Sequence, residues 1–282
     1  MLKIVTDGSA DMPERWKTDF DIHVLPISVA IGDELFTPGE NFSQQDFYRL
    51  VNERRQVPKS SLPSLGKVVD FYRSIASKGD EILSIHVASK MSGTVSVVQS
   101  AARELVEEFS ITVFDSEAGS AALALMCREA SILARSGKPL KDILARLEVA
   151  RQQLTVIFTL DTLEYAYLSG RISRLQSALS ALLQVKPIVI LKDGLLQMAE
   201  KVRTRHNALH RVVELVRAKV EEDPKIIAVV HAADLSAAND LVRVFKDMVN
   251  VKEVFVTDLA IPVAANLGPG TIGIVAYPYL ER

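Results

Sequence analysis

The stretch HVASKMSGTVSVVQSAARE, residues 86–104, decides how the N-terminal half of the chain is interpreted. It begins as an apolar strand, passes through hydroxyl residues and a glycine, and ends in residues that favour a helix. Ser92 is placed to cap that helix by accepting a hydrogen bond from a free N–H in its first turn. A helix N-terminus with a glycine and flanking hydroxyls is also suited to an anion. The residues alone leave both interpretations open.

Strand-like and helix-like segments alternate on both sides of this stretch. The expected strands are 2–6, 23–31, 81–87 and 111–114, and the expected helices are 43–55, 64–78, 93–108 and 118–136. Alternation of this kind over about 130 residues predicts a doubly wound, mostly parallel sheet. We therefore expect residues 1–150 to form an N-terminal Rossmann-like α/β domain, with a further helix over 140–153 at its end.

The second half of the chain has a different pattern. Strands are expected at 155–159, 226–231, 253–257 and 271–275, and helices at 173–183, 205–220 and 235–249. Two further strands, 187–191 and 195–202, flank Asp193-Gly194, a typical hairpin turn. The sequence thus predicts a second α/β domain over residues 151–282 with a mixed sheet. The fold class is a two-domain α/β protein with the ligand held between the domains.

Composition excludes several classes of function. The chain has 282 residues, 48% of them apolar, and a net charge of −2, which argues against a nucleic-acid binder. No apolar stretch reaches the roughly 20 residues of a membrane span, so we expect at most transient contact with a membrane. The single cysteine, Cys127, and the absence of a signal peptide favour the cytoplasm. His206 and His210 lack a third ligand, so neither a metal nor another cofactor is expected.

Hydroxyl and carboxylate residues recur where the expected strands end. Four such clusters lie at 6–9, 60–64, 89–94 and 115–116. The carboxyl ends of parallel strands are where a doubly wound sheet binds its ligands, so the clusters are expected to form one polar crevice. Turn formation and helix capping explain each cluster equally well on its own.

Two later motifs add to this crevice. Arg171 follows a glycine just before an expected helix, where its guanidinium could face a carboxylate or phosphate. Gly268-Pro269-Gly270 forms a tight turn that allows close approach of a ligand or of another backbone segment. A surface arginine and an ordinary turn are the alternatives.

These six motifs, in this order, resemble the DegV family of bacterial two-domain fatty-acid-binding proteins. Residues 6–13 are similar to the family's opening Thr-Asp-Ser-x-x-Asp-Leu-Pro, and residues 60–64 to its Thr-Ser-Gln-Pro-Ser. Residues 89–94 match its Ser-x-x-Leu-Ser-Gly-Thr closely. Asp115-Ser116, 170–173 and 268–270 match its Asp-Ser, Gly-Arg-Ile-Ser and Gly-Pro-Gly. The resemblance extends over nearly the whole chain.

The resemblance implies that a long-chain fatty acid lies buried in a tunnel, with its carboxylate at the helix N-terminus. The implied carboxylate-binding residues are Ser60, Ser92, Gly93, Thr94, Arg171 and Asn266. Asn266 occupies the position of a family histidine, and asparagine cannot take up a proton at neutral pH. Gly8, Ser60 and Leu62 also replace the more usual Ser, Thr and Gln. The apolar tail is expected near the small residues of 118–134 and the apolar face of 175–183, which could equally be ordinary core.

The resemblance further implies a substrate-carrier subunit of a two-component fatty acid kinase that serves phospholipid metabolism. The chain itself would not catalyse; a kinase catalytic subunit would bring ATP and magnesium and convert the presented carboxylate to an acyl phosphate. Three alternatives remain. They are a lipid carrier or chaperone without a kinase partner, a subunit that binds a small sugar or phosphate, and a hydrolase with Ser92 as its nucleophile.

Overall fold

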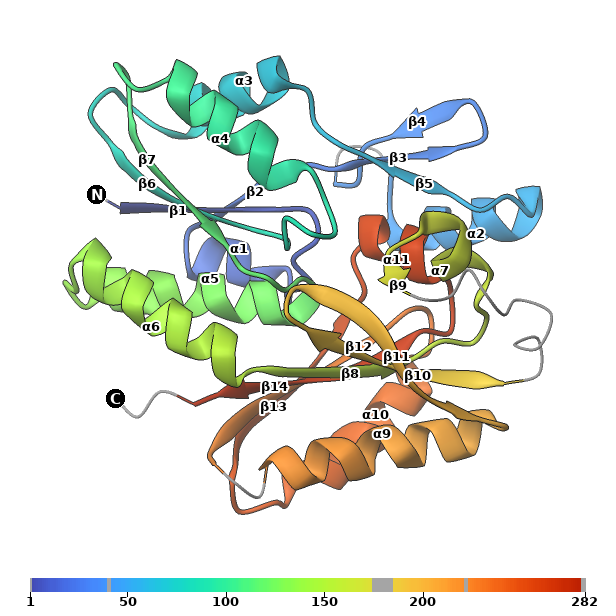
Figure 1. Cartoon of the computed structure of the whole chain (residues 1–282). Helices are drawn as coiled ribbons and strands as arrows, with labels where there is room; N and C mark the ends of the chain where they lie inside the picture. The colour runs from blue at the N-terminus through green and yellow to red at the C-terminus, as the bar shows by residue number, and fades with distance from the viewer. Residues whose placement is uncertain (1, 40–41, 174–184, 221–222, 280–282) are drawn as a thin grey trace.

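The computed structural model describes residues 2–39, 42–173, 185–220 and 223–279. The described chain forms one parallel sheet, one small antiparallel sheet and one mixed sheet, with helices between and outside them (Figure 1). This arrangement confirms the expected α/β fold class. No helix of these ranges has both the length and the apolar character needed to cross a membrane.

Sheet A has four parallel strands in the order β2-β1-β6-β7. Its strands are β1 (Leu2–Asp7), β2 (Ile22–Leu25), β6 (Glu81–His86) and β7 (Ser110–Asp115). Helices α3 (Leu65–Ile75) and α4 (Thr94–Glu104) cover one face through a separate apolar cluster. On the other face lie α1 (Arg15–Asp19) and α5 (Ser120–Arg135), with α6 (Leu140–Gln153) packed on α5.

Sheet C is mixed, with the order β13-β12-β14-β8-β10-β11-β9. Its strands are β8 (Thr155–Thr159), β9 (Ile172–Ser173), β10 (Lys186–Lys192), β11 (Leu195–Val202), β12 (Lys225–His231), β13 (Val251–Asp258) and β14 (Ile272–Pro278). Its outer face is covered by α9 (Arg205–Val220) and α10 (Leu235–Lys246). The predicted β10–β11 hairpin is present, with Asp193 and Gly194 both at positive φ.

The small sheet B lies beside the C-terminal helix of the chain. Its strands, in the order β4-β3-β5, are β3 (Ser28–Ile31), β4 (Glu34–Phe36) and β5 (Lys59–Ser61), and α2 (Gln44–Arg54) follows β4. Helix α11 (Ile261–Leu267) contacts β3, β5 and α7 (Glu164–Ser169). Segments more than 200 residues apart in sequence therefore meet at this point (Figure 1).

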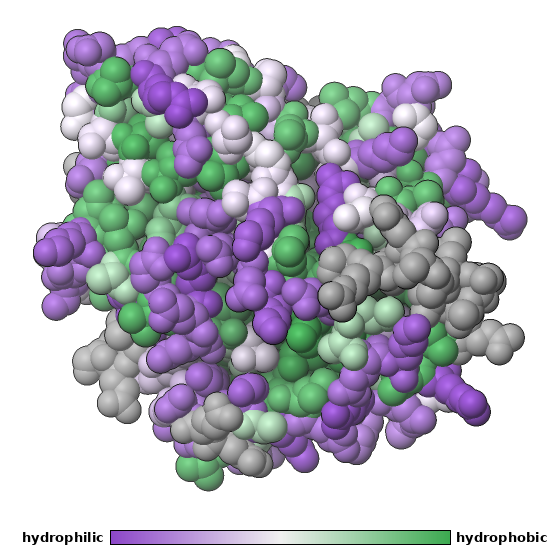
Figure 2. Space-filling model, viewed as in Figure 1, coloured by the Kyte–Doolittle hydropathy of each residue, from purple (hydrophilic) through white to green (hydrophobic). Residues whose placement is uncertain are grey.

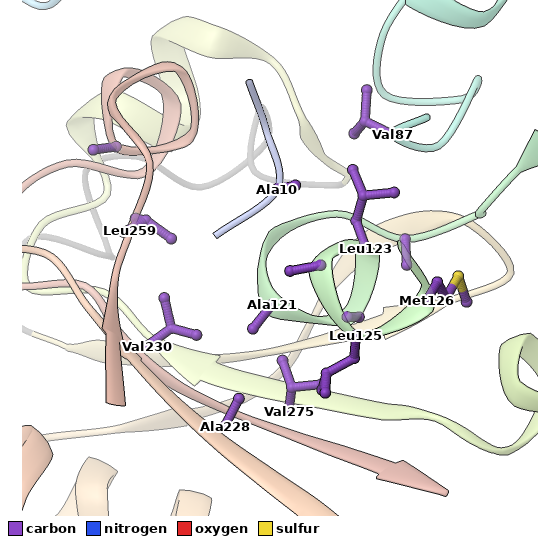
Figure 3. Close-up of a cluster of buried hydrophobic side chains, with 14 of the residues drawn as sticks. Ala10, Val87, Ala121, Leu123, Leu125, Met126, Ala228, Val230, Leu259 and Val275 are labelled. Carbon is purple, nitrogen blue, oxygen red and sulfur yellow. The ribbon is translucent and has the colours of Figure 1, made fainter. Parts of the chain in front are cut away.

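Helix α5 lies between the two large sheets and is buried along most of its length. Its residues from Ala121 to Leu125 are at most 1% exposed. In Figure 3, Ala228, Val230 and Val275 of sheet C lie opposite this helix. One hydrophobic cluster includes residues of sheet A, α5 and the inner face of sheet C.

A buried polar group also connects α5, α6 and β14. The Tyr277 hydroxyl donates to Glu129 Oε2 at 2.5 Å, and Arg146 Nε donates to Glu129 Oε1 at 2.9 Å. Burial, together with the adjacent Glu129 carboxylate, raises the pKa of Tyr277 well above its usual value. Residues on both sides of residue 150 thus share a core, and the division into domains 1–150 and 151–282 stays a prediction.

The structure corrects one of the expected strands and adds several short elements. The single strand over 23–31 is wrong, because the chain leaves sheet A at Leu25 and enters sheet B at Ser28. Pro26, which lacks an N–H to donate to a ladder, stands at the break. Several short elements were not expected, namely α1, β4, α7, β9 and α11. The helix expected over 173–183 falls almost entirely outside the described residues.

Candidate functional site

A cavity of about 410 Å³ lies between the carboxyl edge of sheet A and the inner face of sheet C. Its volume is within the range of roughly 300–1,000 Å³ that is usual for small-molecule sites. The walls come from both large sheets, from sheet B and from α11. Figure 2 shows hydrophobic side chains near the middle of one face of the molecule, within a mainly hydrophilic surround.

One side of the cavity is apolar and is built by sheet C. Its residues are Val156, Phe158, Val230, Gly273 and Val275. Phe158 pairs across the strands with Gly273, where an added Cβ would lie 2.5 Å from Phe158 Cβ. Any side chain at position 273 would therefore clash with Phe158, which explains the glycine. Such a surface can bind a hydrocarbon chain but offers no side-chain hydrogen bonds.

The other side is rich in hydroxyl groups. The serines of this wall differ in exposure. Ser61 and Ser89 are exposed, Ser60 and Ser92 are half-buried, and Ser9 is 8% exposed. Such a wall can satisfy a polar head group while the sheet C wall accepts an apolar tail.

The segment that the sequence singled out forms one end of this polar wall. The N-cap position of α4 is Gly93 rather than Ser92. Ser92 Oγ still accepts from the N–H of Thr94, the first helical residue, at 3.3 Å, and lies 2.9 Å from Thr94 Oγ1. The Gly93 N–H makes no hydrogen bond with any described residue. Helix capping and anion binding are thus compatible. The Ser92 hydroxyl accepts from the first turn of α4, and the N–H of Gly93 remains free to donate to an anion.

Asn266 reaches from α11 to sheet B across this end of the cavity. Its Nδ2 donates to Pro262 O at 2.7 Å and to Ser60 Oγ at 3.3 Å. Because Ser60 Oγ accepts from Asn266, its own hydrogen remains available to another acceptor. Asn266 therefore orients Ser60 as a donor toward the cavity.

Arg171 lines the same cavity as the one cation of the predicted set. It follows Gly170, which ends α7 in the left-handed conformation at φ 70°. Its Nη1 donates to Ser169 O at 2.5 Å, and it forms no ion pair with any residue that the structure describes. A half-buried guanidinium without a carboxylate partner can pair with an anionic ligand.

The structure therefore brings most of the predicted site residues together. Five of them line one cavity: Ser60, Ser92, Gly93, Arg171 and Asn266. Thr94 is fully buried behind Ser92 and contacts it without lining the cavity. Asp115 and Ser116 do not line it, so the expected crevice of four strand-end clusters is wrong in that part.

Asp7 belongs to a separate, closed group rather than to the cavity wall. Its carboxylate accepts from Ser9 N at 2.9 Å and from Val87 N at 3.0 Å, and it contacts His86 Nδ1 at 3.0 Å. Burial alone would raise the pKa of Asp7, but the His86 contact and these N–H donors outweigh it and leave the pKa below its usual value. Asp7 therefore holds the ends of β1 and β6 in place.

This closed group also bears on the hydrolase alternative. His86 Nε2 lies 2.7 Å from Ser84 Oγ, which lies 2.6 Å from the Tyr72 hydroxyl. The order serine, histidine and aspartate is that of a hydrolytic triad. Ser84, His86 and Asp7 are all 0% exposed, and none of them lines the cavity. No substrate can reach Ser84, and no described histidine contacts Ser92.

Asp11 joins three segments that surround the cavity. Its Oδ1 accepts from Ala260 N at 2.7 Å, at the start of α11, and its Oδ2 accepts from Ser120 Oγ at the start of α5. Burial is the largest effect and the nearby Asp258 carboxylate adds to it, so that the pKa of Asp11 is raised to about 7 against the opposing effect of these two hydrogen bonds. The carboxyl group of Asp11 therefore titrates near neutral pH.

The sequence pattern does not predict several of the cavity residues. It does not distinguish Ser9 from the other residues of its motif, and it does not indicate Ser120 or Leu259 as lining residues. The stretch 118–134, expected near a tail, contributes only Gly119 and Ser120, while 175–183 lies outside the described residues. Among the residues that the structure describes, no group of three or more His, Cys, Asp or Glu side chains is arranged to hold a metal ion.

Comparison with known proteins gives a consistent result. The model of the family described as "Uncharacterised protein, DegV family" matches residues 1–279. The DegV domain-containing protein lmo2514 of Listeria monocytogenes is 32% identical over 237 residues, which cover 83% of each chain. Protein DegV of Bacillus subtilis is 28% identical over 275 residues, covering 97% of this chain and 98% of its own.

Solved structures match the whole fold. A fatty acid binding DegV family protein from Thermus thermophilus superposes with a TM-score of 0.91 at 30% identity, covering 99% of both chains. The DegV fatty acid binding protein from Bacillus subtilis superposes with a TM-score of 0.88 at 27% identity, again covering 99% of both.

Proposed function

The chain belongs to the DegV family, and from that premise we propose that it binds a long-chain fatty acid in the cavity between sheets A and C. The observation that carries the proposal is the division of this single cavity into a hydrocarbon-like wall and a hydroxyl-rich wall. An acyl chain with a carboxylate has the same division. Two family members of similar fold are described as fatty acid binding proteins.

The carboxylate is proposed to lie at the N-terminus of α4. A buried carboxylate needs several donors, because its desolvation is otherwise prohibitive. The free Gly93 N–H and the Ser60 hydroxyl that Asn266 orients are two such donors. Ser92 and Arg171 line the same end, and Thr94 supports Ser92 from behind. Charge-assisted hydrogen bonds of this kind fix the direction in which the acid inserts.

The acyl chain is proposed to supply most of the attraction. Burial of ~14 methylene groups at about 0.8 kcal/mol each corresponds to on the order of 11 kcal/mol. Lost rigid-body and chain freedom offset a large part of this gain. Phe158 and Val230 are proposed to contact the chain along the sheet C wall. A small sugar or phosphate would leave that wall unused, which favours the fatty acid over the sugar alternative.

We further propose that the chain presents the acid to a separate kinase subunit, which forms the acyl phosphate. The proposal rests on the family resemblance and on the side chains at the head-group end. Asn266 cannot accept a proton at neutral pH, and its amide is engaged by Pro262 and Ser60. Catalysis is accordingly assigned to the partner. Because Asn266 replaces the family histidine, a lipid carrier without a kinase partner is the second candidate.

Native mass spectrometry of the purified protein tests the proposed binding. We expect a bound mass that organic extraction identifies as a fatty acid, and uptake of added stearic acid by delipidated protein. A ligand-free mass with no uptake contradicts fatty acid binding. The kinase step is tested separately with the catalytic subunit, ATP and loaded carrier. Acyl phosphate formation supports presentation, whereas loading without turnover favours the carrier.

A further inference from the structure

Ser9 is a buried polar side chain that the proposed carboxylate contacts do not include. It is 8% exposed, lines the cavity, and is more buried than Ser60 or Ser92 at the head-group end. Its backbone is fully engaged: the N–H donates to Asp7 at 2.9 Å, and the carbonyl accepts from Ser120 N at 2.8 Å. Its hydroxyl makes no hydrogen bond with any described residue. The hydroxyl is open to the cavity, where it can bind a ligand group or a water.

Ser120 completes this second polar position. It also lines the cavity, and its N–H bond to the Ser9 carbonyl places the two residues side by side. While Asp11 is ionised, its Oδ2 accepts the hydroxyl hydrogen of Ser120. What remains on Ser120 Oγ is lone-pair capacity, so toward the cavity it can only accept. The free Ser9 hydroxyl can donate.

The lining of this cavity also includes apolar side chains, among them Val87 and Leu259 (Figure 3). A buried water commonly makes about three hydrogen bonds, and the two serine hydroxyls supply two. A polar substituent on an acyl chain would be delivered to the two hydroxyls by the chain itself.

We propose that Ser9 and Ser120 form a second polar subsite, which recognises a hydroxyl group carried partway along a fatty acid. The inference rests on the proposed fatty acid binding and adds a substrate class to it, the hydroxylated fatty acids. A hydroxyl is the group that matches both serines at once, because it accepts from Ser9 and donates to Ser120. A keto oxygen can only accept, and a methylene can do neither.

The first experiment compares stearic acid with a series of hydroxystearic acids that differ in the position of the hydroxyl. Binding to delipidated protein is measured by competition in native mass spectrometry. At one position along the chain we expect the hydroxy acid to bind about tenfold more tightly than stearic acid, the value of one to two net hydrogen bonds. Ser9→Ala should abolish that preference, so that the variant binds the hydroxy acid and stearic acid equally. Ser136→Ala, at the opposite end of α5, serves as the matched control.

A second variant changes the hydrogen-bond direction of the subsite. Ala260 N donates to Asp11 Oδ1, so Asp11→Asn places its Oδ1 there and turns Nδ2 toward Ser120. Asn Nδ2 then donates to Ser120 Oγ, and the Ser120 hydrogen is released toward the cavity. The subsite would offer two donors, and the preference should shift from the hydroxy acid to the keto acid of the same position.

The outcomes distinguish a failure of the proposed hydroxyl subsite from a failure of the proposed fatty acid binding. If stearic acid binds and no hydroxy isomer is preferred, the subsite holds water only, and the inference is wrong while fatty acid binding stands. The same conclusion follows if Ser9→Ala keeps the preference. If neither stearic acid nor any hydroxy acid binds, the proposed function itself fails.

Discussion

Two polar groups lie at the carboxyl edge of sheet A, and they differ in whether their hydrogen bonds are complete. In the group of Tyr72, Ser84, His86 and Asp7, each side chain contacts the next, and the group is fully buried. In the wall formed by Ser9, Ser60, Ser92 and Gly93, donors are left over and face a cavity. We refer to these as the closed group and the open wall. The difference shows that the candidate site is marked by donors without a protein partner rather than by the type of residue.

The strongest test of this comparison removes Asp7 from the closed group. Asp7→Ala leaves His86 and the N–H groups of Ser9 and Val87 without their buried acceptor. Breaking a buried pair of this kind costs about 3–5 kcal/mol. The free energy of unfolding from urea titration should fall by that amount. Asp240→Ala, which removes an exposed pair with Arg243, should change it little. A loss from Asp7→Ala no greater than that of Asp240→Ala would show that the closed group does not support the fold.

The matching test of the open wall removes a donor from the cavity. Ser92→Ala should weaken fatty acid binding by about 1–3 kcal/mol, the cost of leaving a charged acceptor short of a partner. Its effect on the free energy of unfolding should be smaller than its effect on binding, because in the folded protein Ser92 Oγ serves only Thr94. Isothermal titration with stearic acid measures the first quantity, and urea titration the second. Equal affinity in the variant and the parent places the carboxylate elsewhere.

Asp11, which holds Ser120 at the cavity, and Asp7 of the closed group should respond to pH in different windows. The pKa of Asp11 is raised to about 7 from an ordinary value of 3.8, so the folded state binds more protons than the unfolded state between about pH 4 and 7. Stability from Asp11 is therefore fully present below about pH 4 and is lost as pH rises to about 7, by up to ~1.4 kcal/mol per pH unit. Asp7, whose pKa is lowered, acts in the opposite sense: its contribution is lost only as pH falls below about 4.

Asp11→Asn isolates the first of these effects. The amide keeps an acceptor for Ala260 N and cannot ionise, so the decline in stability between pH 4 and 7 should flatten relative to the parent. Urea titrations at several pH values between 4 and 8 measure this slope. A slope that is identical in the variant and the parent would assign the pH dependence to another group.

The smallest expected effect lies at the outer end of the closed group. Tyr72→Phe removes one hydroxyl while Ser84 keeps its contact with His86. We expect a loss of about 0.5–1.5 kcal/mol in the free energy of unfolding, with fatty acid affinity unchanged. A change in affinity would show that the closed group and the open wall are coupled.

Long periodic segments allowed most of the fold to be predicted from sequence. Helices α6 and α9 begin and end at the expected residues, as does β8. The strand expected over 23–31 was wrong because an apolar run does not reveal that Pro26 divides it between two sheets. Helices α7 and α11 have six and seven residues, too few to show helical periodicity. Helix α11 nevertheless supplies Asn266, which had been placed only by its position before Gly-Pro-Gly.

The site could be predicted in part for a related reason. Motif order grouped Ser60, Ser92, Arg171 and Asn266 correctly around one cavity. Nothing in the sequence distinguishes Asp7, which contacts His86 in the interior, from Ser9, which lines the cavity. That distinction depends on partners from β6 and α5, which lie about 80 and 110 residues away in sequence. The apolar wall was likewise missed, since its strands resemble ordinary core.

Helix α5, embedded between two sheets, has a kinetic consequence. A hinge motion that separated sheets A and C to open the cavity would remove Ala121 and Leu125 from their packing contacts. It would also expose Glu129 and Tyr277 to solvent. Because this core is almost completely buried, such an opening is unfavourable. An acyl chain is therefore expected to leave lengthwise, and its release should slow with each added methylene.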